Sequence, residues 1–222
     1  ECRRDIITML ERAGSGHPGG SLSAIDIIVT LFFNEIQRKV DDALWDDRDR
    51  FILSKGHAVP ALYAVLAKQG SIPYEELATL RLINSRLQGH PDRVLLPFVE
   101  ASTGSLGQGL SIAQGVAMGL KLKKKSARVF CLMGDGETQE GQVWETALSA
   151  PKFKLNNLIV FIDNNNGQID GKVEEVMDLR PLADKWRAFR WAVQEIDGHD
   201  FGQILNALKV AKTETERPSL IV

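Results

Sequence analysis

Two groups of oxygen-bearing residues in this sequence are spaced as the ligands of a metal ion and a phosphate group would be. Asp135, inside a Gly-Asp-Gly turn, follows the largely apolar run 128–133, and Asn165, inside an Asn triplet, follows the apolar run 158–162. Such runs are typical of buried strands in a parallel sheet, whose carboxyl ends share the edge where open α/β sheets bind ligands. Carboxylate and amide oxygens suit Mg²⁺ holding a diphosphate rather than zinc. Either motif alone would be an ordinary polar turn, but the two together predict a magnesium–diphosphate site.

All four histidines, His17, His57, His90 and His199, directly follow a glycine. Glycine allows close approach of the backbone to a ligand, and imidazole transfers protons and binds hydroxyls or phosphates near neutral pH. Any one of them alone would fit a surface loop, whereas the repeated pattern favours a shared cleft. No two have the spacing of zinc ligands. The glycine-rich segment 104–109 lacks the dinucleotide-binding spacing, but at a helix start it could seat an anion or allow tight helix packing.

Alternating helices and strands are expected to position these residues. Helices are expected at about 3–12, 21–36, 55–69, 103–121, 143–149, 178–189 and 200–212, with a short one from Pro73, and strands at 51–54, 128–133, 158–162, 191–196 and from 219 onward. Ser21 or Ser23 is expected to cap the second helix. The alternation predicts the α/β class, with a doubly wound, mostly parallel sheet and helices on both faces.

Length and composition limit the classes of protein to consider. The chain has 222 residues, enough for one sizeable core, and we expect 1–222 to be a single domain that is trimmed at both ends. A net charge of −2 gives no sign of nucleic-acid binding. No apolar run is long enough for a membrane span, so no membrane association is expected. Cys2 and Cys131 do not form a disulfide framework, and a cytoplasmic location fits.

Together these residues resemble the diphosphate-binding half of transketolase. The resemblance covers nearly the whole sequence and rests on ordered motifs: Ser15-Gly-His-Pro-Gly19, Leu53-Ser-Lys-Gly-His-Ala58, Gly89-His-Pro91, Thr103-Gly-Ser-Leu-Gly-Gln-Gly109, Gly134-Asp-Gly-Glu137 with Glu140-Gly141, Asp163 to Gly171 ending in Ile-Asp-Gly, and Asp197-Gly-His199. It implies a thiamine-diphosphate-binding fold and a transferase that moves a two-carbon ketol unit from a ketose (phosphate) donor to an aldose acceptor. Thiamine diphosphate and Mg²⁺ would be the cofactors, with Ca²⁺ or Mn²⁺ as substitutes for the metal.

The resemblance also implies which residues bind the cofactors. Asp135 and Asn165 would ligate Mg²⁺ through their side chains, and Gly167 through its carbonyl oxygen. Two diphosphate oxygens and a water would complete the octahedron that Mg²⁺ prefers. Further contacts with the cofactor would come from His57, Gly104, Ser105, Leu106, Gly134, Gly136 and Glu137. Ser105 stands where many relatives have proline, so the contacts with the cofactor rings could differ here.

The catalytic residues that the resemblance implies are His17, His57, His90 and Glu140. His17 and His90 would also contact substrate hydroxyls and move protons, and Arg81 would bind a substrate phosphate. Glu140 would belong to an acidic network that links two active sites. Its position before an expected helix also fits an N-terminal cap, and both interpretations stay open.

Enzymes of this kind need a glutamate from a second, pyrimidine-binding domain, which this sequence does not contain. We therefore expect the chain to be inactive alone and to pair with a C-terminal transketolase subunit in an α₂β₂ assembly. A fragment of one long transketolase is the alternative. Two further interpretations stay open: another thiamine-diphosphate enzyme (deoxyxylulose-phosphate synthase-like or 2-oxoacid decarboxylating) and a non-catalytic regulatory subunit. The Ser-Lys-Gly-His-Ala and Gly-His-Pro-Asp loops favour a sugar substrate, but which sugars react does not follow from the fold.

Overall fold

A five-stranded sheet, parallel throughout, forms the centre of the computed structural model, which describes residues 1–169 and 171–222. In order across the sheet, its strands are β1 (Arg50–Leu53), β2 (Val129–Gly134), β3 (Leu158–Asp163), β7 (Ser219–Ile221) and β6 (Ala192–Gln194). A short antiparallel hairpin of β4 (Gly167–Gln168) and β5 (Gly171–Lys172) follows β3. Asp170 of the Ile-Asp-Gly motif lies outside the described residues.

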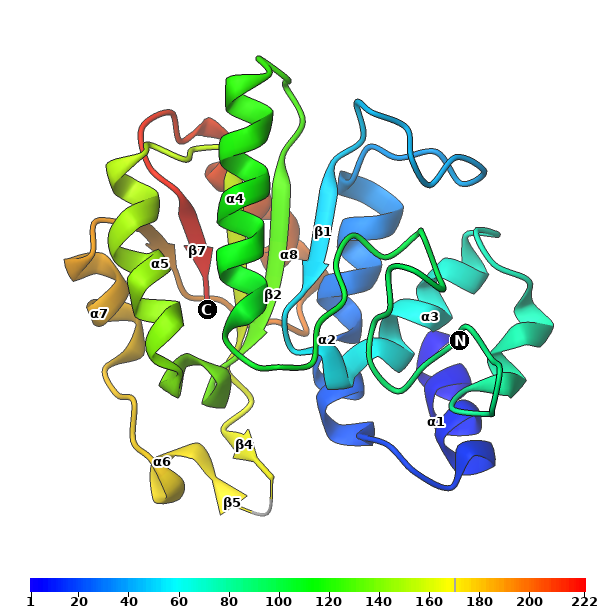
Figure 1. Cartoon of the computed structure of the whole chain (residues 1–222). Coiled ribbons are helices and arrows are strands. Elements are labelled where there is room, and N and C mark those ends of the chain that lie inside the picture. The colour runs from blue at the N-terminus through cyan, green and yellow to red at the C-terminus, as the bar shows by residue number, and fades with distance from the viewer. Residues whose placement is uncertain (170) are drawn as a thin grey trace.

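Helices cover both faces of this sheet. They are α1 (Cys2–Ala13), α2 (Pro18–Thr30), α3 (Val59–Lys68), α4 (Gln108–Leu122), α5 (Gly141–Lys152), α6 (Val173–Val176), α7 (Leu182–Ala188) and α8 (Phe201–Thr213). Alternate residues of β2 face opposite layers: Phe130 and Leu132 pack with α1, α2, α3 and α8, and Cys131 and Met133 with α4, α5 and α7. Figure 1 shows α4 and α5 in front of the sheet and α8 behind it. The predicted doubly wound α/β fold is therefore confirmed.

The start of α2 differs from the expectation drawn from the sequence. The helix begins at Pro18, before both serines, and His17 occupies the N-cap position without a side-chain capping bond. Proline suits the first turn because its φ is already helical and it has no N–H that needs a partner. The predicted serine cap is thus wrong. The regular helix also ends earlier than expected, and a π-helical turn, Leu31–Glu35, completes the segment.

Other boundaries differ for local reasons. Helix α7 begins only after Pro181, because a residue that precedes proline avoids the helical region. The hairpin and α6 are short segments that the apolar pattern did not reveal. Across the described residues, no helix has the length and apolar composition needed to cross a bilayer.

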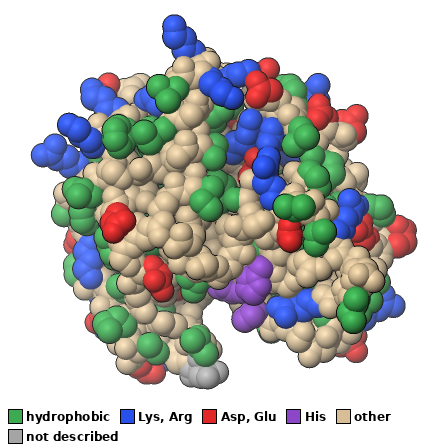
Figure 2. Space-filling model, in the orientation of Figure 1, with side chains coloured by type: hydrophobic (Ala, Val, Ile, Leu, Met, Phe, Trp, Pro, Cys, Tyr) green, Lys and Arg blue, Asp and Glu red, His purple; other side chains and the backbone are tan. Residues whose placement is uncertain are grey.

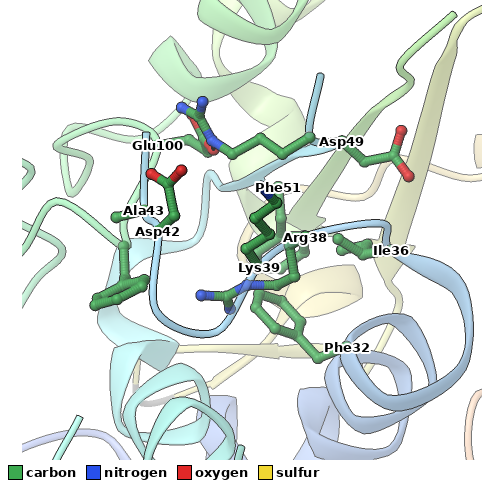
Figure 3. Close-up of a pocket in the computed structure, with 11 residues that line it drawn as sticks. Phe32, Ile36, Arg38, Lys39, Asp42, Ala43, Asp49, Phe51 and Glu100 are labelled. Carbon is green, nitrogen blue, oxygen red and sulfur yellow. Dashed lines mark hydrogen bonds and ion pairs between the residues drawn. The ribbon is translucent and has the colours of Figure 1, made fainter. Parts of the chain in front are cut away.

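Two arginines anchor the irregular segment that leads into α4. Arg48 donates two hydrogen bonds to the carboxylate of Glu100, at 2.6 and 2.8 Å. The guanidinium of Arg38 lies over the rings of Phe32 and Phe98, 5.1 and 5.4 Å from their centroids. Burial lowers the pKa of Arg38 to about 10, so it stays charged at neutral pH. Figure 3 shows Arg38, Phe32 and Glu100 lining the small pocket between these segments. The contacts of Arg48 with Glu100 and of Arg38 with Phe98 hold the end of the irregular segment that carries His90.

Candidate functional site

Asp135 links the turn after β2 to the Asn triplet after β3. The two strands end level, with Gly134 opposite Asp163 in the register. The carboxylate of Asp135 is 3% exposed and accepts the N–H of Gly136 at 2.8 Å and that of Asn166 at 2.7 Å. Burial raises the pKa of this carboxyl group. The predicted meeting of the two motifs at one edge of the sheet is therefore present.

Asn165 directly precedes Asn166, which donates to this carboxylate, and two neighbours orient the amide of Asn165. Its Nδ2 lies 3.2 Å from the hydroxyl of Ser23, and its Oδ1 accepts the N–H of Gly167 at 2.8 Å. The side chain is exposed, so hydrogen bonds rather than packing set its orientation. Gly167, at the start of β4, is exposed as well. The structure thus brings amide, carboxylate and backbone oxygen donors to one edge of the sheet.

A buried ion pair supports this edge, and sequence reasoning missed it. Lys55 Nζ lies 2.5 Å from Asp163 Oδ2, with only 1% and 8% of the two side chains exposed. Ser23 Oγ lies 2.5 Å from the same carboxylate oxygen. The available signal was that Lys55 comes two residues after the end of β1 and Asp163 is the last residue of β3, so both lie at the carboxyl ends of parallel strands.

Glu137 joins three of the glycine-rich motifs. Its carboxylate accepts the hydroxyl of Ser54, the N–H of Gly107 at 2.9 Å and the N–H of Gly134 at 3.1 Å. The side chain is almost fully buried, and burial raises its pKa. Gly107 has a φ of +82°, which glycine adopts without strain, and a side chain there would meet Glu140. Glu137 therefore fixes the relative positions of the loops that carry the predicted site residues.

Three of the four histidines lie together. The ring of His17 is 5.3 Å from that of His57 and 6.5 Å from that of His90, measured between centroids. His57 also packs against the first turn of α2, where a Cβ added to Gly20 would lie 2.8 Å from its ring. Figure 2 shows histidine side chains gathered in a hollow of the surface. His199 is not part of this group, contrary to the expected common cleft of four.

His199 lies on the loop before α8, where it pairs with a buried carboxylate. Its Nδ1 is 2.8 Å from Oδ2 of Asp26, a residue of α2. It lines a cavity of about 340 Å³ together with Ser23 and Asn165. This places His199 on the Asn165 side of the sheet edge.

His57 is held in its neutral form. Burial, and next the charge of Lys55, lower its pKa from 6.5 to about 4. The unfolded chain therefore binds the proton more tightly, so this contribution to stability is complete above pH 6.5 and is lost as the pH falls toward 4. We expect an NMR titration to place the midpoint of His57 near pH 4. In His57→Gln, the free energy of unfolding should fall less between pH 6.5 and pH 4 than it does in the unaltered protein. A midpoint at the ordinary histidine value would contradict this prediction.

Arg81 and the glycine loops surround His90. The guanidinium of Arg81 covers Gly89, where an added Cβ would lie 2.7 Å from Cζ. Burial and the charge of Arg81 lower the pKa of His90. Gly104 has a φ of +144°, and a side chain there would press on the His90 ring at 3.0 Å. Arg81 and Gly104 thus meet at His90, within the histidine group.

Ser105 and Leu106 continue from Gly104 toward α4, and both are exposed. Glu140 occupies the N-cap position of α5, but its side chain makes no capping hydrogen bond. The capping interpretation therefore holds for its position only, and its exposed carboxylate does not cap the start of the helix.

The comparisons with known proteins agree over the whole chain. Residues 2–222 match the family model for the thiamine diphosphate binding domain of transketolase. The 6-deoxy-6-sulfo-D-fructose transketolase subunit SqwG of Clostridium sp. is 42% identical, covering 99% of this chain and 80% of the relative. An apulose-4-phosphate transketolase subunit from Phocaeicola vulgatus is 38% identical, covering 99% and 78%.

A crystal structure of a transketolase variant from Pichia stipitis superposes with a TM-score of 0.92 and 30% identity over 99% of this chain. The chain spans 34% of the length of that transketolase. It spans about four fifths of the length of each of the two transketolase subunits. The resemblance in the sequence motifs is thereby confirmed. The chain belongs to the transketolase family and matches its N-terminal, thiamine-diphosphate-binding domain.

Proposed function

We propose that the edge formed by β2 and β3 binds the diphosphate of thiamine diphosphate through a Mg²⁺ ion. Asp135 and Asn165 would hold the ion with side-chain oxygens and Gly167 with its carbonyl. The observation that carries the proposal is the hydrogen bond from the Asn166 N–H to Asp135, which ties both oxygen-bearing turns together. The donors fit the group: one buried carboxylate and neutral oxygens suit a hard divalent cation, and Mn²⁺ or Ca²⁺ could replace Mg²⁺.

The remaining contacts with the cofactor would come from the loops that Glu137 holds together. Gly134 and Gly136 would let the backbone of the turn approach the diphosphate, and His57 would lie beside it as a neutral hydrogen-bonding group. Gly104, Ser105 and Leu106 would face the rings. When bound, the cofactor would supply a nucleophilic carbon that breaks the bond next to a ketose carbonyl and carries the two-carbon unit to an aldose.

The protein's part in the reaction would be to orient the sugar and move protons. His17 and His90 would contact substrate hydroxyls, since their rings lie in one cluster beside the proposed cofactor site. The guanidinium of Arg81, next to His90, would bind an anionic group of the substrate such as a phosphate. Glu140, exposed and free of a capping role, would take part in an acidic network with a second active site.

A partner subunit would supply the pyrimidine-binding domain and its glutamate. This chain covers about four fifths of the length of two relatives that are named as transketolase subunits. Their names support the interpretation that this chain is the first subunit of a split enzyme rather than a fragment of one long chain. The assembly would contain two copies of each subunit. It would act on sugar phosphates in the cytoplasm, with residues 1–222 forming one of its domains.

The test is a donor screen on the complex of the full-length chain with its partner subunit, in the presence of Mg²⁺ and thiamine diphosphate. We expect transfer of a two-carbon unit from ketose phosphates to aldoses, and no activity when either protein is assayed by itself. Release of CO₂ from 2-oxoacids would assign a different reaction of the same cofactor. Turnover by this chain alone would refute the need for a partner.

A further inference from the structure

Ser23, on α2, lies between two polar residues at the end of β3. Its Oγ is 2.5 Å from Oδ2 of Asp163 and 3.2 Å from Nδ2 of Asn165. It also lies 3.3 Å from the carbonyl oxygen of Gly20. A hydroxyl has a single hydrogen to donate. The carboxylate of Asp163 is closer than the carbonyl and carries a charge, so it receives this hydrogen.

The direction of every bond in this chain of contacts then follows. Lys55 can only donate, so Asp163 accepts from both Lys55 and Ser23. The oxygen of Ser23 is left as an acceptor, and within the Asn165 amide only the NH₂ end can donate to it. The Oδ1 of Asn165 consequently points away from Ser23, where it accepts the N–H of Gly167 at 2.8 Å.

We propose that Ser23 is a positioning residue that determines which end of the Asn165 amide faces the metal ion. This inference rests on the proposed function. A carboxamide presents oxygen at one end and NH₂ at the other, and only the oxygen can ligate a cation. The Asn165 side chain is exposed, so little packing opposes its rotation. Without the hydroxyl of Ser23, the amide could rotate and turn its NH₂ group toward the ion.

The experiment measures Mn²⁺ binding by electron paramagnetic resonance, on the complex with the partner subunit in the presence of thiamine diphosphate. We expect Ser23→Ala to weaken Mn²⁺ binding by about 10-fold, because losing a partner that orients a metal ligand costs roughly 10- to 100-fold. Ser23→Thr keeps the hydroxyl and should bind Mn²⁺ as the unaltered protein does. Ser111→Ala is the matched control, since that hydroxyl on α4 pairs with Thr146 instead, and it should leave the affinity unchanged.

A second background separates orientation from general stability. In Asn165→Asp both ends of the side chain are oxygens, so adding Ser23→Ala should cause no further loss of Mn²⁺ affinity. An equal loss in both backgrounds, or an unchanged affinity in Ser23→Ala alone, would overturn the role of Ser23. Asp135→Ala tells the two proposals apart. If it loses Mn²⁺ while Ser23→Ala does not, only the Ser23 inference fails; if it binds Mn²⁺ normally, the proposed metal site fails.

Discussion

Asp135→Ala should remove Mg²⁺-dependent thiamine-diphosphate binding from the assembled complex, and the transferase activity with it. Asp135 is the one charged donor among the proposed ligands, so its loss leaves two neutral oxygens against a divalent cation. We expect the affinity for thiamine diphosphate at fixed Mg²⁺ to fall by more than about 100-fold, beyond the range for residues that merely orient a ligand. Isothermal titration calorimetry on the complex measures this.

The side chain of Asp135 also accepts hydrogen bonds from two backbone N–H groups. A control must therefore separate the loss of these bonds from the loss of the metal ligand. Asp49 is matched: it accepts the N–H of Gln37 at 2.9 Å and of Arg128 at 2.7 Å, just before β1 at the opposite edge of the sheet. Asp49→Ala should lower stability without changing the cofactor affinity. Asp135→Ala with unaltered affinity would disprove the proposed metal site.

The sequence predicted that the two oxygen-bearing motifs share one edge, because that expectation depends only on both strands being parallel. Two runs of five apolar residues, 129–133 and 158–162, had to be buried, and parallel strands place their carboxyl ends together. In the structure the two strands end level, with Gly134 opposite Asp163. His17 and His57 were predictable for a similar reason, because their glycine loops come just before α2 and just after β1. His90 lies in the irregular segment between residues 80 and 107, and no element boundary places it.

What the sequence could not predict are contacts between side chains from distant segments. Lys55 and Asp163 are 108 residues apart, and neither stands in a pattern that calls for a partner. The pairing of His199 with Asp26 likewise depends on where α2 and the loop before α8 meet in space. The start of α2 was misplaced because serines are good caps in general, whereas the proline before them starts the helix sooner.

Lys55→Met should destabilise the protein by about 3–5 kcal/mol, because it leaves the carboxylate of Asp163 buried without its counter-charge. The remaining bond from Ser23 favours the lower end of this range. Urea unfolding monitored by tryptophan fluorescence measures the change, and the double variant Lys55→Met with Asp163→Leu should recover most of it, since apolar groups can replace a buried pair. Lys154→Met is the matched control: its pair with Glu216 is 68% and 63% exposed, so no measurable change is expected. A loss in Lys55→Met as small as in this control would show that Asp163 is solvated in solution, and the support of the sheet edge would then have to come from Ser23 and Glu137.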